Sequence, residues 1–150
     1  MTLDEGDDAP AVEAVNQRGE TVAPDFAEPT VLYFYPRDDT PGCTVEAKQF
    51  DQELASYRDA DVALYGVSTD DVESHEAFVA KYDLGFDLLA DPDEAIAAAF
   101  DVDVEKDYAA RTTFVLADGE VKAVYEGVDP DGHAREVLGD VLDEGLASLN

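Results

Sequence analysis

Cys43 is the residue of this chain whose type and position best suit nucleophilic chemistry. It is the only cysteine in the sequence, and it follows Thr40 and Pro41, a pair that favours the start of a helix. The apolar and aromatic run 31–35 predicts a buried strand, so Cys43 falls in the first turn of a helix that follows a strand. The unpaired N–H groups and the dipole of such a turn stabilise a thiolate, the reactive form of cysteine. The same N–H groups can bind an oxygen of a substrate.

The elements on either side of Cys43 must hold it in place. Pro36 ends the preceding strand, because proline has no N–H to donate to a sheet. The helix has an apolar face, formed at three- and four-residue spacing by Ala47, Phe50, Leu54 and Tyr57. A lone cysteine is more often a small buried hydrophobic side chain than a nucleophile, so its position alone leaves both interpretations of Cys43 open.

The residues around Cys43 resemble the peroxiredoxin family. Pro36, Thr40 and Cys43 stand in the Pro-x-x-x-Thr-x-x-Cys arrangement of that family. The longer string, with Gly42 and Glu46, is similar to the branch known as peroxiredoxin Q or bacterioferritin comigratory protein. The resemblance covers nearly the whole chain and includes the segments 63–70, 73–82, 87–92, 111–119 and 132–134.

The resemblance implies a role for each of these residues. In the family the cysteine is the peroxidatic nucleophile, the Thr40 hydroxyl both caps the helix and faces the thiolate and the incoming peroxide, and Pro36 shields the thiolate from water. Arg111 resembles the arginine that reaches the thiolate, although an arginine at a strand end is more commonly solvated. Glu46 either holds that arginine in place or is simply an acidic residue favoured near a helix start.

The implied reaction is an in-line attack by the Cys43 thiolate on the terminal oxygen of a peroxide. Arg111, Thr40 and the backbone N–H groups of Gly42 and Cys43 stabilise the charge on the leaving oxygen, with Pro36 and Gly42 on the substrate-binding side of the site. The cysteine becomes a sulfenic acid, which a thiol must reduce. Many members of this branch carry a second cysteine five residues after the first, where this chain has Lys48. We therefore expect a one-cysteine cycle with an external thiol, either a thioredoxin-like protein or a low-molecular-weight thiol.

Three functions are compatible with this pattern. The first is a thiol-dependent peroxidase that reduces hydrogen peroxide and organic hydroperoxides in antioxidant defence. The second is a peroxide sensor or adaptor, in which oxidation of Cys43 changes a partner contact without sustained turnover. The third is a thioredoxin-like scaffold with an unreactive thiol. Sustained peroxide consumption separates the first function from the other two.

The charge of the chain is unusual, because 37 acidic residues accompany only 9 basic ones, a formal net charge of −28 over 150 residues. Such a surface repels itself at low salt, whereas in molar salt the Debye length falls to about 3 Å and the repulsion is screened. The composition favours a salt-rich cytoplasm, as in halophilic archaea, over an ordinary acidic protein. Nucleic acid is not expected as a partner, because the chain has no basic patch for phosphates.

No metal, cofactor or membrane partner is expected. His75 and His133 have no third partner at the spacing of a metal site or a Cys-His protease. Asp129-x-Asp131-Gly132 resembles a calcium loop but lacks the remaining ligands. No apolar stretch is long enough to span a membrane, and the N-terminal residues are unlike a signal peptide. A single cysteine excludes an internal disulfide, which agrees with a reducing cytoplasm.

The order of predicted elements indicates one α/β domain over residues 1–150, with residues 1–8 frayed. The predicted elements are a hairpin turning at 16–19, a strand at 31–35, the Cys43 helix, a strand at 62–67, a helix over 72–82, a strand at 88–89, a helix from 91 to about 100, an irregular segment at 101–110, a hairpin of 111–117 and 120–125, and a last helix with its apolar face at 137–146. Right-handed crossovers place helices on both faces of a mixed central sheet. Together with the resemblance, this order implies a thioredoxin-like sandwich with an added N-terminal β-hairpin.

Overall fold

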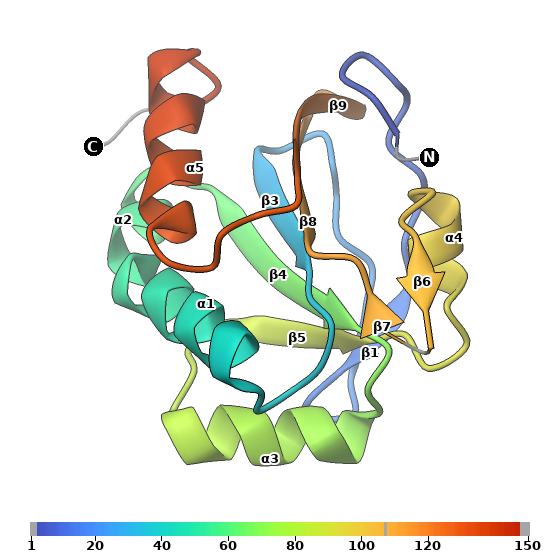
Figure 1. The fold of residues 1–150 in the computed structure, drawn as a ribbon. Coiled ribbons are helices and arrows are strands. Elements are labelled where there is room, and N and C mark those ends of the chain that lie inside the picture. The colour runs from blue at the N-terminus through green and yellow to red at the C-terminus, as the bar shows by residue number, and fades with distance from the viewer. Residues whose placement is uncertain (1–2, 107, 148–150) are drawn as a thin grey trace.

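A mixed β-sheet forms the centre of the protein. The computed structural model describes residues 3–106 and 108–147, and within them seven strands form one sheet in the order β2-β1-β5-β4-β3-β8-β9 (Figure 1). Its strands are β1 (Ala14–Asn16), β2 (Thr21–Val22), β3 (Thr30–Phe34), β4 (Ala63–Ser68), β5 (Asp87–Ala90), β8 (Thr112–Ala117) and β9 (Glu120–Glu126). β3, β4 and β5 run parallel, and the other neighbours pair antiparallel. A small separate sheet pairs β6 (Val104–Glu105) with β7 (Tyr108–Ala109).

β3 lies inside the sheet because its side chains suit burial on both faces. All of its residues are buried, and successive side chains alternate between two cores, with Tyr33 on one face and Phe34 on the other. The antiparallel register with β8 places Thr112 opposite Phe34. Arg111, the residue before β8, therefore lies beside the end of β3, where the chain leaves the sheet toward its first helix.

Helices cover both faces of the sheet, as predicted. The helices are α1 (Pro41–Gln52), α2 (Leu54–Asp59), α3 (Val72–Tyr82), α4 (Ala95–Ala99) and α5 (His133–Asp143). Residues of α1, α2 and α5, with Phe78 of α3, share the core that contains Tyr33, whereas α4 packs in the core on the opposite face. Figure 1 shows α1, α2 and α5 on one side of the sheet and α4 with β6 and β7 on the other. The predicted α/β sandwich with its N-terminal hairpin is confirmed.

The small helix after β5 begins at Ala95 rather than at Asp91, where it was predicted. The carboxylate of Asp91 accepts hydrogen bonds from the backbone N–H groups of Ile96 and Ala97, each at 2.9 Å. Glu94 has a left-handed backbone with φ of 61°, which cannot belong to a right-handed helix. Asp91 therefore caps the helix from outside it.

Two other elements also differ from prediction. The helix after Cys43 is divided, because α1 ends at Gln52 and α2 begins at Leu54. Leu54 and Tyr57 still lie in the same core as α1, so the apolar face continues across the break. The segment 101–110, expected to be irregular, contains the short strands β6 and β7.

The N-terminal segment is attached to β9 and to the end of α4. The N–H of Leu3 donates to the carbonyl of Phe100 at 3.2 Å, and the N–H of Gly6 donates to the carbonyl of Val121 at 2.8 Å. In return, the N–H of Val121 donates to the carbonyl of Asp7 at 2.8 Å. These bonds oppose the fraying expected for residues 1–8, of which 1–2 lie outside the described residues.

Candidate active site

Cys43 lies in the first turn of α1, directly after the loop of residues 35–40 that leaves β3. The loop turns at Asp39, whose φ of 57° is left-handed. Thr40 occupies the N-cap position with an extended backbone, and Pro41 is the first helical residue, as predicted. Cys43 is only 2% exposed and packs in the core between the sheet and α1. The thiol is thus almost fully removed from water at the positive end of a helix.

Arg111 brings a positive charge to the sulfur. Its Nη2 donates to Sγ of Cys43 at 3.4 Å, and its Nη1 donates to Oε1 of Glu46 at 2.6 Å. The side chain of Arg111 is 16% exposed and that of Glu46 is fully buried, so water screens these contacts much less than surface contacts. The fold therefore brings together Cys43, Glu46 and Arg111, three residues that the family resemblance had suggested as a group.

Glu46 lies one turn after Cys43 on the same face of α1 and is 1% exposed. Burial raises the pKa of Glu46 to about 7, because the loss of hydration outweighs the opposing charge and hydrogen bond of Arg111. Burial by itself lowers the pKa of Arg111, but the charges of Glu46 and Cys43 hold that pKa above its ordinary value. Near neutral pH, Arg111 is therefore a cation beside a carboxyl group that is partly protonated. Much of the positive charge is left to act on the sulfur.

Gly42 lies against the guanidinium of Arg111. A methyl group at Gly42 would lie 3.1 Å from Nη2 of Arg111 and 3.7 Å from Cγ of Pro130. The missing side chain therefore lets the start of α1 and the arginine share the space around the sulfur. The resemblance assigned Gly42 only a backbone N–H, so this packing role is an addition from the structure.

Thr40 and Pro36 lie in the loop before α1. The hydroxyl of Thr40 donates to the carbonyl of Arg37 at 3.0 Å and makes no hydrogen bond to the helix, so the predicted side-chain cap is wrong. The hydroxyl closes the loop instead, which is a local alternative open to threonine. The first-turn N–H groups keep their capacity to bind an oxygen of a ligand. Pro36 is half-buried and lies just beyond β3, as predicted.

Asp38 and His75 form a contact that sequence reasoning missed. Nδ1 of His75 lies 2.7 Å from Oδ2 of Asp38, and both side chains are buried. His75 stands three residues before Phe78 and seven before Tyr82, the spacing of one helix face. That periodicity could have placed His75 in the core, although it could not have identified Asp38 as its partner.

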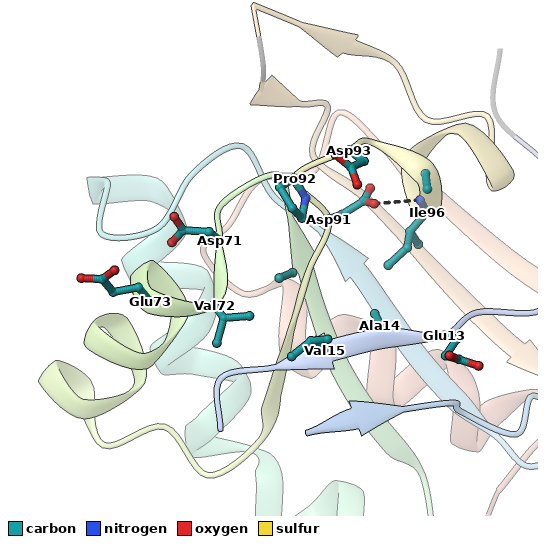
Figure 2. A pocket seen from close by; sticks show the side chains of 12 residues that line it. Glu13, Ala14, Val15, Asp71, Val72, Glu73, Asp91, Pro92, Asp93 and Ile96 are labelled. Atoms are coloured by element: carbon teal, nitrogen blue, oxygen red, sulfur yellow. Dashed lines mark hydrogen bonds between the residues drawn. The ribbon is translucent and has the colours of Figure 1, made fainter. Parts of the chain in front are cut away.

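A cavity of about 540 Å³ lies elsewhere, between β1 and the starts of α3 and α4 (Figure 2). Among the described residues, its lining includes neither Cys43 nor Arg111. The carboxylate of Asp91 at this cavity is already bonded to N–H groups of α4, as the dashed line to Ile96 in Figure 2 illustrates. In the part of the chain that the structure covers, no cluster of three or more metal-ligating side chains occurs. No helix in that part is both long and apolar enough to cross a membrane.

Comparison with known proteins places this geometry in a family. The family model described as "AhpC/TSA family" matches residues 5–124. Peroxiredoxin Bcp of Bacillus subtilis is 38% identical over 148 residues, which cover 92% of this chain and 94% of that protein. Peroxiredoxin Bcp of Xanthomonas campestris is 42% identical over 116 residues, which cover 72% of each chain. The solved structure of Xanthomonas campestris peroxiredoxin Q matches with a TM-score of 0.86 and 34% identity, and the match covers 94% of this chain and 98% of the other.

The chain belongs to the AhpC/TSA family. Its similarity to proteins named peroxiredoxin Bcp and peroxiredoxin Q extends over most of its length, and the thioredoxin-like peroxiredoxin fold is confirmed. It is therefore a peroxiredoxin, an oxidoreductase that reduces peroxides at the expense of a thiol.

Proposed function

We propose that this peroxiredoxin reduces hydrogen peroxide and organic hydroperoxides with Cys43 as its only redox-active thiol. The thiolate attacks the terminal oxygen, the O–O bond breaks, and the leaving oxygen takes up the proton that the thiol released on ionising. The products are a cysteine sulfenic acid, oxidised by two electrons, and water or an alcohol. The observation that carries the proposal is the 3.4 Å contact from Nη2 of Arg111 to Sγ, which stabilises the attacking thiolate.

The other residues assist this step in distinct ways. The first-turn N–H groups, including that of Gly42, stabilise the developing charge on the leaving oxygen together with Arg111. Thr40 offers a hydroxyl oxygen that can still accept a hydrogen bond, because its proton is given to the carbonyl of Arg37. Pro36 limits the access of water to the thiolate, and Glu46 orients the guanidinium.

Organic hydroperoxides belong in the proposal because of a related protein. The structure of Xanthomonas campestris bacterioferritin comigratory protein, which is 34% identical with a TM-score of 0.83, concerns the alkyl peroxide reduction activity of that protein. The match covers 89% of this chain and 91% of the other. We extend the same substrate class to this chain.

An external thiol must complete the cycle, because the sequence has no second cysteine. This thiol attacks the sulfenic sulfur, releases water and forms a mixed disulfide with Cys43. A second external thiol then displaces Cys43 and leaves within the external disulfide. Either a thioredoxin-like protein or a low-molecular-weight thiol can supply this chemistry. Lys48, at the position of the second cysteine in many members of the branch, is exposed, with its Nζ 5.8 Å from the ring of Tyr82.

The acidic composition supports a proposal for the setting of the reaction. A formal net charge of −28 is tolerated best where salt screens repulsion, so we place the protein in a salt-rich cytoplasm, as in halophilic archaea, with a role in antioxidant defence. Neither nucleic acid nor a membrane is proposed as a partner.

Peroxide consumption in molar salt tests the proposal. The reduced protein should consume peroxide stoichiometrically without a reductant and continuously with dithiothreitol, and Cys43→Ser should consume none. Continued consumption by Cys43→Ser would overturn the proposal. Stoichiometric oxidation of the wild type without turnover, with dithiothreitol or with reduced thioredoxin, would support the sensor function instead.

A further inference from the structure

The polar cluster around His75 is centred on two buried side chains, His75 and Asp38, whose polar atoms all have partners. His75 is 0% exposed, its Nδ1 lies 2.7 Å from Oδ2 of Asp38, and its Nε2 lies 3.1 Å from the carbonyl of Leu89. Both ring nitrogens of His75 thus face oxygen atoms of the protein. Oδ1 of Asp38 accepts from the hydroxyl of Tyr35 at 2.6 Å, and Oδ2 also accepts from the hydroxyl of Ser74 at 2.8 Å. Asp38 and His75 therefore form a buried, hydrogen-bonded pair.

This pair joins the loop before α1 to α3 and to the sheet. Asp38 belongs to the loop of residues 35–40, His75 to α3 and Leu89 to β5. The backbone N–H of Asp38 also donates to the carboxylate of Asp70 at 2.7 Å, just after β4. Figure 1 shows the segment between β3 and α1 descending toward α3, where these contacts occur. These contacts therefore fix the middle of the loop to α3 and to the segment after β4, while β3 and α1 hold its two ends.

A second set of contacts holds the same loop at the surface. The carboxylate of Asp39 accepts from Nζ of Lys81 at 2.8 Å and from the hydroxyl of Tyr82 at 2.7 Å, both on α3. These groups are exposed, so the contact is worth little compared with a buried one. Removing the His75 ring would take one hydrogen-bond partner from each of two buried oxygens, which costs more than losing a surface contact that water can replace. The Asp38–His75 pair is the main constraint on this loop.

We propose that His75 is a positioning residue for peroxide reduction, because its buried contact with Asp38 fixes the loop that carries Pro36 and Thr40 next to Cys43. The inference rests on the proposed function of Cys43. Only one residue separates Asp38 from Pro36 and one separates it from Thr40, so a displacement of Asp38 moves both. Misplacement of about 1 Å in a catalytic arrangement can lower a rate about 10²-fold.

His75→Gln tests this proposal, with His133→Gln as the matched control. His133 is also a buried histidine, 2% exposed, but its Nε2 lies 2.8 Å from Oγ1 of Thr113 and its ring packs on Phe50, so these contacts are with β8 and α1 rather than with the loop. Both variants should melt at lower temperature than the wild type. Only His75→Gln should lower the rate of the reductant-independent peroxide step per folded molecule, by up to about 10²-fold. It should also change the ratio of the rates for cumene hydroperoxide and hydrogen peroxide, since the loop shapes access to the thiol.

Two further variants keep the test decisive if His75→Gln does not fold. Ser74→Ala removes only one hydrogen bond to Asp38, and it should change the rate and the substrate ratio in the same direction by a smaller factor. The double variant Asp38→Asn/His75→Gln, which buries no charge, should recover part of the rate lost in His75→Gln. An unchanged rate and substrate ratio in folded His75→Gln or Ser74→Ala would overturn the positioning role. A wild type that consumes no peroxide would instead overturn the proposed function itself.

Discussion

The two polar pairs near the start of α1, Arg111 with Glu46 and Asp38 with His75, differ in how completely their polar atoms are used. Arg111 and Glu46 are joined at 2.6 Å, yet Oε2 of Glu46 has no hydrogen-bond partner among the described atoms, and Nη2 of Arg111 points to the thiol. Asp38 and His75 are joined at 2.7 Å, and every polar atom of both side chains has a partner. The Arg111–Glu46 pair thus keeps an oxygen that can still accept a hydrogen bond, whereas the polar atoms of Asp38 and His75 are all paired.

This difference suits the first pair to stabilising charge during the reaction and the second pair to holding its neighbours in place. A charge that is only partly compensated can act on a thiolate and on a developing negative charge, because water is largely excluded from the site. A fully paired cluster favours one arrangement of its neighbours and resists change. We infer that Arg111 and Glu46 adjust the electrostatics at Cys43, while Asp38 and His75 set its surroundings.

Removal of Arg111 eliminates the first of the two pairs and should have the largest effect on the peroxide rate. Arg111→Ala takes the cation away from Sγ of Cys43 and leaves Glu46 buried without its partner. We expect the rate of peroxide consumption per folded molecule to fall about 10²–10³-fold, the usual loss on removing one group that stabilises developing charge. Stopped-flow measurement on the reduced protein in molar salt checks this expectation.

Arg135→Ala is the matched control for the loss of a positive charge. Arg135 donates to Glu53 at 2.9 Å, but its side chain is 85% exposed, so its removal should change neither the rate nor the melting temperature appreciably. If Arg111→Ala reacted as fast as Arg135→Ala, the guanidinium would have no role in activating the thiol.

The second prediction concerns the pH dependence of stability that Glu46 contributes. Burial raises the pKa of Glu46 from an ordinary 4.5 to about 7, and Arg111 opposes this only in part. Because the folded pKa lies above the unfolded one, the associated stability is complete below pH 4.5 and is lost as the pH rises through about 7. At about 1.36 kcal/mol per pKa unit, the loss amounts to about 3 kcal/mol.

Glu46→Gln keeps an oxygen acceptor for Arg111 but removes the ionisable group. The variant should match the wild type in stability near about pH 4 and exceed it by up to about 3 kcal/mol near about pH 8. Denaturant unfolding at both pH values measures this difference. Glu76→Gln, at an exposed position of α3, removes the same formal charge and controls for net charge. A difference that did not vary with pH would contradict the raised pKa of Glu46.

Local sequence patterns were sufficient to predict most of the fold and part of the site. α3 spans Val72–Tyr82 as predicted, because Asp71 accepts a hydrogen bond from the N–H of Ser74 at 2.9 Å and the apolar periodicity continues to Tyr82. The place of Cys43 at the start of α1 follows from equally local information, namely a buried strand, a Thr-Pro pair and an apolar helix face.

The parts that local patterns could not predict depend on contacts between distant segments. Arg111 lies 68 residues after Cys43 and reaches it only because β8 pairs with β3 in one particular register. Asp38 and His75 are 37 residues apart in the sequence and come into contact because α3 packs against the loop before α1. The hydroxyl of Thr40 donates to the carbonyl of Arg37 instead of capping the helix. These two local hydrogen-bonding arrangements compete, so the sequence does not decide between them. Family resemblance supplied the first of these contacts but neither of the other two.

The smallest expected effect comes from moving the guanidinium without removing any charge. In Gly42→Ala, the new methyl group would lie 3.1 Å from Nη2 of Arg111, so the guanidinium must shift by a few tenths of an ångström. Nη1 is held by Glu46, and the shift therefore changes the contact of Nη2 with the sulfur of Cys43. We expect about a tenfold decrease in the peroxide rate, less than for a 1 Å misplacement, with little change in melting temperature.

Gly139→Ala separates this steric effect from the general effect of alanine in a helix. Gly139 is exposed in α5, and a methyl group there meets no atom within 4 Å outside the backbone of its own helix. Alanine at this position should stabilise the protein by about 0.5–1 kcal/mol and leave the peroxide rate unchanged. If Gly42→Ala also left the rate unchanged, the contact between Nη2 of Arg111 and the sulfur would tolerate displacement. The peroxide rate would then depend on the charge of the Arg111–Glu46 pair and not on its exact geometry.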